Sequence, residues 1–149
     1  MIKKFFFLIF MLSFFNNLYA QYPNLAYEFS FKGIDGEKID LKDYKNKVIV
    51  VVNVASRCGY TPQYDDLQKL WLDYKDNNLV VIGVPTNNFK QEPGTNEEIK
   101  NFCETNFNIT FPMTSKYNVK GKDAHPIYVW AKETFGNSAV PKWNFHKIL

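Results

Sequence analysis

The sequence predicts an α/β fold in which helices flank a central mixed sheet. Two short runs, 47–55 and 79–84, are rich in β-branched residues, as is typical of strands that are covered on both faces. Between them, the apolar residues of 67–74 recur with the spacing of one face of a helix. A strand, a helix and a second strand in this order predict a βαβ unit with parallel strands.

A β-hairpin is predicted ahead of this unit. Residues 27–41 alternate between apolar and polar around Asp35-Gly36, a dipeptide that favours tight hairpin turns. We expect the apolar side chains of both hairpin strands to face the core together. They are Phe29, Phe31, Ile39 and Leu41.

Capping residues indicate where the first two helices begin. Thr61 is a suitable N-cap for the first helix, and Pro62 suits its first position. Thr95 and Glu98 have the spacing of a capping box, which predicts a second helix over about 96–106. Both predicted helices therefore have a defined start.

The last part of the chain adds one more helix and one more strand. Residues 126–135 predict a third helix, which Gly136 ends, and residues 143–149 have strand character. The complete order is a hairpin, a βαβ unit, helices and a further strand. This order predicts a sandwich of the thioredoxin type.

Residues 1–20 have the organisation of a secretory signal peptide. A short basic start precedes the apolar run 5–15, and Ala20 offers a small residue for cleavage. The run is too short to span a bilayer, which takes about 20 apolar residues. We therefore expect a mature domain over 21–149, exported to the periplasm or secreted, without stable membrane insertion after cleavage. An uncleaved membrane anchor is the alternative.

The composition argues against several classes of function. The formal net charge is +3, and no basic patch argues for nucleic-acid binding. The two cysteines, Cys58 and Cys103, form no CxxC motif, and with two scattered histidines they make a poor zinc site. We expect no metal. In an exported domain the two cysteines could simply form a structural disulfide.

Cys58 is placed where a reactive cysteine is expected. It follows the end of a buried strand and precedes a helix, and sites in α/β sheets favour the carboxyl ends of strands. The free N–H groups of a helix start and the neighbouring Arg57 both favour the thiolate, which is the nucleophilic form. A buried, inert cysteine is the alternative that position alone leaves open.

Four motifs decide between these alternatives, because in sequence and order they resemble the glutathione peroxidase family. The first contains Cys58 and reads VNVASRCGYTPQYDDL, and the second reads NNFKQEPGTNEEI. The four motifs occupy 52–67, 87–99, 121–130 and 142–149. The resemblance implies a thioredoxin fold and reduction of hydroperoxides. It also implies no cofactor, since a thiol reductant, either a thioredoxin-like protein or glutathione, is the co-substrate.

The resemblance also implies roles for individual residues. Cys58 is the peroxidatic nucleophile, and Gln91, Trp143 and Asn144 complete a catalytic tetrad. Their amide and indole N–H groups suit a thiolate and a developing oxyanion. Without the resemblance, the alternatives are that Gln91 is only a loop residue, Trp143 a core residue and Asn144 a turn former. Cys103 takes the place of the resolving cysteine of thioredoxin-dependent members, although it could be a core residue of its helix.

A resolving role for Cys103 requires movement. Cys58 is expected at a helix entrance and Cys103 within the 96–106 helix, whereas bridged Cα atoms lie within roughly 7 Å of each other. We expect a wider gap in the reduced protein, closed by local unwinding of that helix. A disulfide formed from a Cys58 sulfenic acid would then be reduced by a dithiol.

The chain departs from the family pattern at two places. Only Lys90 separates Phe89 from Gln91, where the family often has two small residues, and Thr86 stands where the family has a cysteine. The family continues beyond the last motif with a strand and a helix, whereas this sequence stops at Leu149. We therefore expect a C-terminally truncated fold with exposed apolar sheet surface and low stability.

The resemblance also bears on oligomeric state and substrate. The segment between Ala131 and Trp143 lacks the long insertion of tetrameric relatives, which predicts a monomer with an open site. Such a site accepts hydrogen peroxide and also organic or lipid hydroperoxides. The alternative function is a redox relay, in which Cys58 senses peroxide and passes the oxidation to a partner protein.

Overall fold

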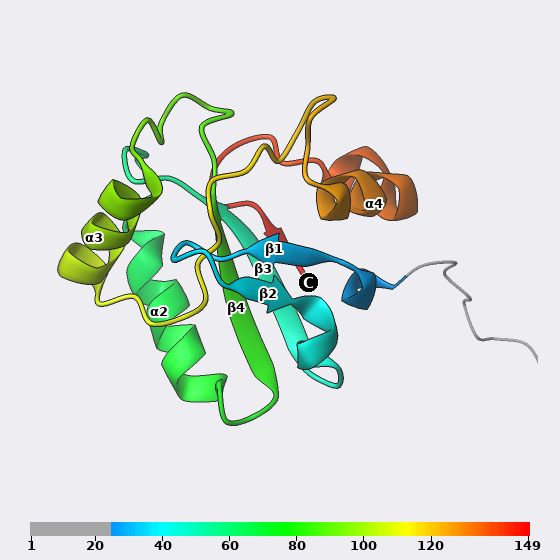
Figure 1. Ribbon diagram of the computed structural model, residues 1–149, viewed down its shortest axis with the longest axis horizontal. Coiled ribbons are helices and arrows are strands. Elements are labelled where there is room, and N and C mark those ends of the chain that lie inside the picture. The colour runs from blue at the N-terminus through cyan, green and yellow to red at the C-terminus, as the bar shows by residue number, and fades with distance from the viewer. Residues whose placement is uncertain (1–24) are drawn as a thin grey trace, which may run out of the picture.

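The longest β-branched run forms the centre of the sheet. Strands β3 (Val48–Val54) and β4 (Leu79–Pro85) pair in parallel over their whole lengths, and helix α2 (Gln63–Tyr74) connects them. The predicted βαβ unit is confirmed. Figure 1 shows this computed structural model, which describes residues 25–149. The predicted signal peptide, 1–20, lies outside the described residues.

The sheet is mixed because the last strand runs against its neighbour. Strand β5 (Lys147–Ile148) pairs with β3 in the antiparallel sense, so the order in the sheet is β4-β3-β5. The strand predicted over 143–149 is thus much shorter than expected. Its first residues form a turn instead, in which Phe145 has a φ of 63°.

The hairpin is confirmed as a separate two-stranded sheet. Strands β1 (Ser30–Lys32) and β2 (Lys38–Asp40) pair in the antiparallel sense. Three of the four apolar residues expected to face the core are buried, and Phe29 is half-buried. The buried three are Phe31, Ile39 and Leu41. Short 3-10 helices lie at Ala26–Glu28, Leu41–Tyr44 and Gly136–Ala139.

Helices α3 (Asn96–Phe107) and α4 (Pro126–Phe135) begin and end close to the predicted residues. The capping box before α3 is complete. The Thr95 hydroxyl accepts the Glu98 N–H at 3.2 Å, and the Glu98 carboxylate accepts the Thr95 N–H at 2.7 Å. Gly136 is the C-cap of α4, as predicted.

The start of α2 differs from the prediction. The helix begins at Gln63, and Pro62 takes the N-cap position without a side-chain cap. Thr61 is not the N-cap, because its hydroxyl bonds to backbone groups of the preceding turn. The residue is therefore used to shape the segment that carries Cys58.

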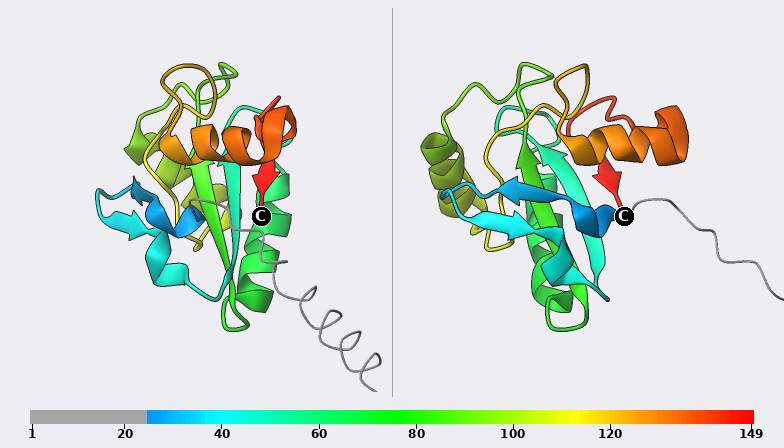
Figure 2. Two further views of the ribbon diagram at one scale, coloured as in Figure 1. Left: turned by 90° about the vertical axis from the view of Figure 1, so that its right-hand side faces the viewer. Right: turned by 45° about the vertical axis from the view of Figure 1, so that its right-hand side comes forward.

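Elements pack on both faces of the β3–β4 sheet (Figure 2). Helices α2 and α3 cover one face, and α4 with the hairpin covers the other. Alternate residues of each strand enter the two cores, as a two-sided sheet requires. The strand residues of the first core include Val50, Val52, Val54 and Val81. Those of the second core include Val51, Val80, Ile82 and Val84.

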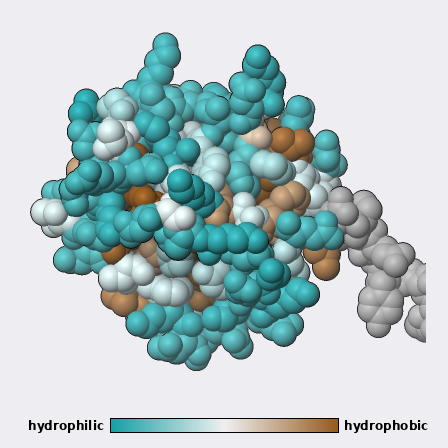
Figure 3. Space-filling view, viewed as in Figure 1, coloured by the Kyte–Doolittle hydropathy of each residue, from teal (hydrophilic) through white to brown (hydrophobic). Residues whose placement is uncertain are grey.

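The surface is largely polar in the view of Figure 3, with small apolar areas between polar residues. An apolar hollow of about 220 Å³ lies beside β5, where Ile49, Ile127 and Leu149 contribute to its lining. Within residues 25–149, no helix has the length and apolar character needed to cross a bilayer.

Candidate active site

Cys58 lies in a tight turn between β3 and α2. The Thr61 hydroxyl accepts the Cys58 N–H at 3.1 Å and donates to the Ala55 carbonyl at 2.9 Å. The sulfur of Cys58 accepts the Tyr60 N–H at 3.4 Å. This N–H is a hydrogen-bond donor directed at the sulfur. The turn therefore both fixes the thiol and provides it with a donor.

Gln91 is held next to this turn and is oriented by Asn144. The carbonyl of Gln91 accepts the Arg57 N–H at 3.0 Å, which joins the two loops one residue away from Cys58. The side-chain oxygen of Gln91 accepts the Asn144 amide N–H at 2.8 Å. Because that oxygen is occupied, the amide NH₂ group of Gln91 remains as its free end, and it is a donor.

Asn53 explains how the last motif is held in place. Its side-chain amide donates to the Trp143 carbonyl at 3.1 Å, and its own carbonyl accepts the Phe145 N–H at 2.6 Å. Its N–H also donates to the His146 carbonyl at 3.3 Å. Phe145, with its positive φ, lies in a region that bulky residues rarely adopt. The polar break in the buried strand is thus the clamp for the turn that carries Asn144.

Trp143 and Asn144 have different surroundings. Asn144 is 4% exposed, and its side-chain oxygen has no hydrogen-bond partner among residues 25–149. The alternative that Trp143 is a core residue is wrong, because it is 45% exposed. Its ring packs against Phe89 with the centroids 5.3 Å apart. Asn144 therefore faces inward towards Gln91, whereas Trp143 lies at the surface of the site.

The shortened loop before Gln91 is closed by an unusual conformation at Lys90. This residue has a φ of 59°, in the left-handed region where glycine is the common choice. Its N–H donates to the Asn87 carbonyl at 2.9 Å, which completes the turn. Thr86 is buried, and its hydroxyl accepts the Asn88 N–H at 3.3 Å. The loop therefore reaches the site without the pair of small residues.

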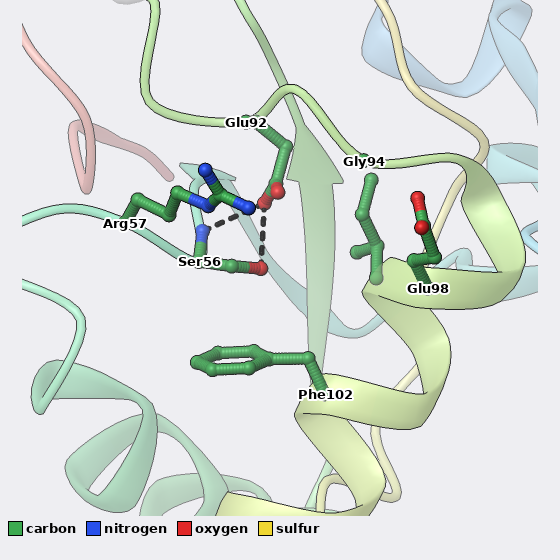
Figure 4. A pocket seen from close by; sticks show the side chains of 7 residues that line it. Ser56, Arg57, Glu92, Gly94, Glu98 and Phe102 are labelled. Atoms are coloured by element: carbon green, nitrogen blue, oxygen red, sulfur yellow. Dashed lines mark hydrogen bonds between the residues drawn. The ribbon is translucent and has the colours of Figure 1, made fainter.

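Glu92 is a buried acid beside the site that the sequence did not single out. It is 1% exposed, and its carboxylate accepts the Ser56 N–H at 2.7 Å and the Ser56 hydroxyl at 3.0 Å (Figure 4). Burial raises the pKa of this carboxyl, while the Ser56 hydrogen bonds and the charges of Lys116 and Arg57 oppose the rise. Glu92 thus ties the Cys58 turn to the Gln91 loop.

The guanidinium of Arg57 is directed towards the Glu92 pocket. Arg57 and Glu92 line a hollow of about 200 Å³, together with Gly94, Glu98 and Phe102 (Figure 4). The sequence had suggested Arg57 as a cation for Cys58. In the structure, its charge lowers the pKa of the Glu92 carboxyl.

Cys103 lies on the inner face of α3, in the same apolar core that contains Cys58. It is 1% exposed, and both cysteines are free thiols, so the structure contains no structural disulfide between them. Burial raises the pKa of the Cys103 thiol to about 11. The Tyr64 hydroxyl opposes this rise in pKa, although its contact with the thiol is too loose for an ordinary hydrogen bond.

The structure thus brings four of the five predicted site residues into connected loops. The side chains of Gln91 and Asn144 form a hydrogen bond, and the backbone N–H of Arg57, the residue before Cys58, donates to the Gln91 carbonyl. Trp143 directly precedes Asn144 in the chain. Cys103 lies on α3, outside these loops but in the core cluster that also contains Cys58. Within residues 25–149, no group of three or more His, Cys, Asp or Glu side chains is placed to hold a metal ion.

Residues 26–132 match the glutathione peroxidase family. The chain belongs to this family. It is 46% identical over 126 residues to a glutathione peroxidase of Lactococcus lactis, which covers 83% of this chain and 80% of that protein. It is 43% identical over 139 residues to a hydroperoxy fatty acid reductase of Synechocystis, with 87% and 82% covered. The enzyme class predicted from the sequence, a peroxidase, is confirmed at the level of the family.

Solved structures agree with this membership. The structure of T. cruzi GPX1 superposes with a TM-score of 0.62 at 34% identity, covering 81% of this chain and 75% of that one. The thioredoxin-like fold predicted from the sequence is therefore confirmed.

Proposed function

We propose that this protein is a thiol peroxidase in which Cys58 reduces hydroperoxides. One observation carries the proposal most directly. The sulfur of Cys58 accepts a backbone N–H in a turn that is hydrogen-bonded to the loop of Gln91, whose amide is oriented by Asn144. A thiolate beside a preorganised neutral amide donor is the arrangement that peroxide reduction needs.

The first step is attack of the Cys58 thiolate on the peroxide. A sulfur–oxygen bond forms as the O–O bond breaks, and the leaving oxygen takes a proton to become water or an alcohol. Cys58 becomes a sulfenic acid. In this proposal, the N–H groups of Gln91 and Trp143 stabilise the negative charge that moves from sulfur to the leaving oxygen, and Asn144 holds the Gln91 amide in orientation.

The second step uses Cys103 as the resolving cysteine. Its thiol condenses with the sulfenic acid to form a disulfide and water. At neutral pH a thiol with a pKa of about 11 is almost fully protonated, and the side chain is enclosed by the core. Resolution therefore requires α3 to open locally. A thioredoxin-like dithiol then reduces the disulfide, and glutathione is the alternative reductant.

The test is peroxide consumption with a thioredoxin-type dithiol, with glutathione or with neither. We expect Cys58→Ser to show no turnover above the uncatalysed rate. Cys103→Ser should consume one equivalent of peroxide in a single-turnover measurement but lose dithiol-dependent cycling. Full activity in Cys58→Ser contradicts the proposed nucleophile, and dithiol-dependent turnover in Cys103→Ser contradicts the resolving role. Transfer of the disulfide to a partner without peroxide turnover supports the redox relay instead.

We also propose that the domain over 21–149 acts as an exported monomer, after cleavage of 1–20. The order of basic, apolar and small residues at the start of the chain supports export. Mass spectrometry of the protein from a periplasmic or secreted fraction should give a mature chain that begins at Gln21. A full-length chain in the membrane fraction would favour the uncleaved anchor. Light scattering measures the oligomeric state independently.

A further inference from the structure

Tyr64 is a buried titratable residue that takes no part in the two proposed steps. It lies in the first turn of α2 and is 0% exposed, and its hydroxyl has no hydrogen-bond partner among residues 25–149. A buried hydroxyl without a partner costs stability. A phenylalanine side chain would fill the same space without this cost, so packing alone does not account for the hydroxyl.

The Tyr64 side chain lies between elements that belong to the two thiols. Its ring packs against Phe107, the last residue of α3, with the ring centroids 5.2 Å apart. It also meets the ring of Phe145, in the turn of the last motif, at 5.4 Å. Helices α2 and α3 are neighbours here (Figure 1), and Tyr64 belongs to the core cluster that contains both Cys58 and Cys103.

The Tyr64 hydroxyl lies beside the Cys103 thiol. Burial raises the pKa of Cys103, and the hydroxyl is the group that opposes this rise. Burial, followed by the nearby Cys103, raises the pKa of Tyr64 well above its usual range. The phenol therefore stays protonated at neutral pH. It can act as a hydrogen-bond donor but not as a base.

The resolving step needs Cys103 as a thiolate. Its electron pair forms the S–S bond with the Cys58 sulfur while the S–O bond of the sulfenic acid breaks. The proton that Cys103 loses goes to solvent, and the leaving hydroxide takes a proton from solvent to become water. Cys103 is oxidised and the sulfenic acid is reduced. A thiol in apolar surroundings ionises poorly, and a hydrogen bond to the charged sulfur offsets that effect.

We propose that the Tyr64 hydroxyl donates a hydrogen bond to the Cys103 sulfur as that thiol ionises, and so activates Cys103 for attack on the Cys58 sulfenic acid. This inference rests on the proposed function and names a group that acts in its resolving step. The Tyr64 N–H donates to the Thr61 carbonyl at 3.0 Å, which fixes Tyr64 to the Cys58 turn. The donor therefore stays with that turn when α3 opens.

The test follows formation of the Cys58–Cys103 disulfide after one equivalent of hydrogen peroxide, by acid quench and peptide mass spectrometry. We expect Tyr64→Phe to slow this step about threefold at pH 7, because the smaller thiolate fraction is only partly offset by a more nucleophilic thiolate. Oxidation of Cys58 should keep its rate. Tyr128→Phe is the matched control, since it removes another buried hydroxyl without a partner, from the core on the other face of the sheet. It should resolve as fast as the wild type.

A stronger donor separates hydrogen bonding from packing. A fluorinated tyrosine at position 64 keeps the ring and has a more acidic hydroxyl, so disulfide formation should be faster than in the wild type. The inference is overturned if the rate does not increase from phenylalanine through tyrosine to the fluorinated ring. Equal slowing in Tyr64→Phe and Tyr128→Phe would overturn it as well.

Failure of the proposed function gives a different result. A wild type that forms no Cys58–Cys103 disulfide with peroxide refutes the resolving role of Cys103. The donor can still be tested in that case, in Cys58→Ser, through exchange of Cys103 with a dithiodipyridine disulfide. Adding Tyr64→Phe should slow this exchange about threefold relative to adding Tyr128→Phe. An equal rate in the two double variants would refute Tyr64 as the donor.

Discussion

Cys58 and Cys103 are both buried free thiols, yet their surroundings differ. Cys58 is 8% exposed and lies in a turn where its sulfur accepts a backbone N–H. Cys103 is 1% exposed on the apolar face of α3, and burial raises its pKa to about 11. Burial alone therefore does not decide which thiol reacts with peroxide. The two sulfurs differ in that one accepts a backbone N–H and the other lies in apolar surroundings. In the function proposed above, this difference assigns attack to Cys58 and resolution to Cys103.

The largest expected effect is a difference in alkylation. At pH 7 we expect Cys103 in the folded, reduced protein to react with iodoacetamide at least tenfold more slowly than in the unfolded chain, because a pKa of about 11 leaves little thiolate. Cys58 should be labelled first. Peptide mass spectrometry measures both sites in one sample, and guanidinium-unfolded protein is the control. Equal rates in the folded protein would contradict the comparison.

The next largest effects are expected from substituting a hydroxyl residue beside each thiol, Thr61 beside Cys58 and Tyr64 beside Cys103. Thr61→Val should destabilise the protein by about 2 kcal/mol, since it removes both hydrogen bonds of the hydroxyl in the Cys58 turn. It should also slow peroxide oxidation of Cys58. Thr61→Ser, which keeps the hydroxyl, is the control. Denaturant unfolding measures the change in stability, and single-turnover kinetics measure the oxidation rate. Unchanged oxidation kinetics in Thr61→Val would contradict a role of the turn in the reactivity of Cys58.

Tyr64→Phe is the corresponding change at the other thiol. We expect the pKa of Cys103 to rise further, because the Tyr64 hydroxyl lowers it in the wild type. Stability should change by less than about 1 kcal/mol, since the hydroxyl makes no ordinary hydrogen bond within residues 25–149. The pH dependence of Cys103 alkylation gives the pKa. A fall in that pKa would contradict the assigned role of the hydroxyl.

A smaller, pH-dependent effect is expected at Glu92. Burial raises its pKa above the usual 4.5, so the folded state binds this proton more tightly than the unfolded state. The contribution of Glu92 to the free energy of unfolding therefore falls as pH rises from about 4.5 through its folded-state pKa. Glu92→Gln lacks this ionisation and keeps an oxygen for Ser56. Its stability relative to wild type should rise over that window in urea unfolding; a constant difference would count against the assignment.

The smallest effect concerns the loop next to Gln91. Lys90→Gly should stabilise the protein by about 0.5 kcal/mol, because glycine adopts the left-handed conformation of Lys90 without strain. Cys58 and Cys103 should keep their relative alkylation rates. Thermal unfolding provides the measurement. A loss of stability would show that the side chain of Lys90 contributes more than its conformation costs.

The sequence predicted the parts of the fold that depend on local patterns. The βαβ unit, the capping box at Thr95 and the end of α4 at Gly136 follow from residues a few positions apart, and all three are confirmed. Thr61 was assigned wrongly, because its hydroxyl could serve either the helix or the preceding turn. The turn won that competition through partners three and six residues before Thr61, and the capping pattern did not reveal this turn.

The site followed a similar division. The family motifs pointed to Gln91 and Asn144, and the structure joins their side chains. The same motifs contained Glu92, but a carboxylate in a polar loop gives no sign that it is buried. Asn53 was visible as a polar break in an apolar strand, whereas its partner, Trp143, is 90 positions away in the chain. Such contacts are set by packing, so sequence patterns alone do not predict them.

The clamp at Asn53 also determines when the site exists during synthesis. A chain leaves the ribosome at about 5–20 residues per second, so the turn of Cys58 emerges several seconds before Trp143 and Asn144. Contacts between such distant positions also form late in folding. A nascent chain therefore carries a free thiol before it has the amides to use it. During that interval, the Cys58 thiol can meet oxidants without the side chains that surround it in the folded protein.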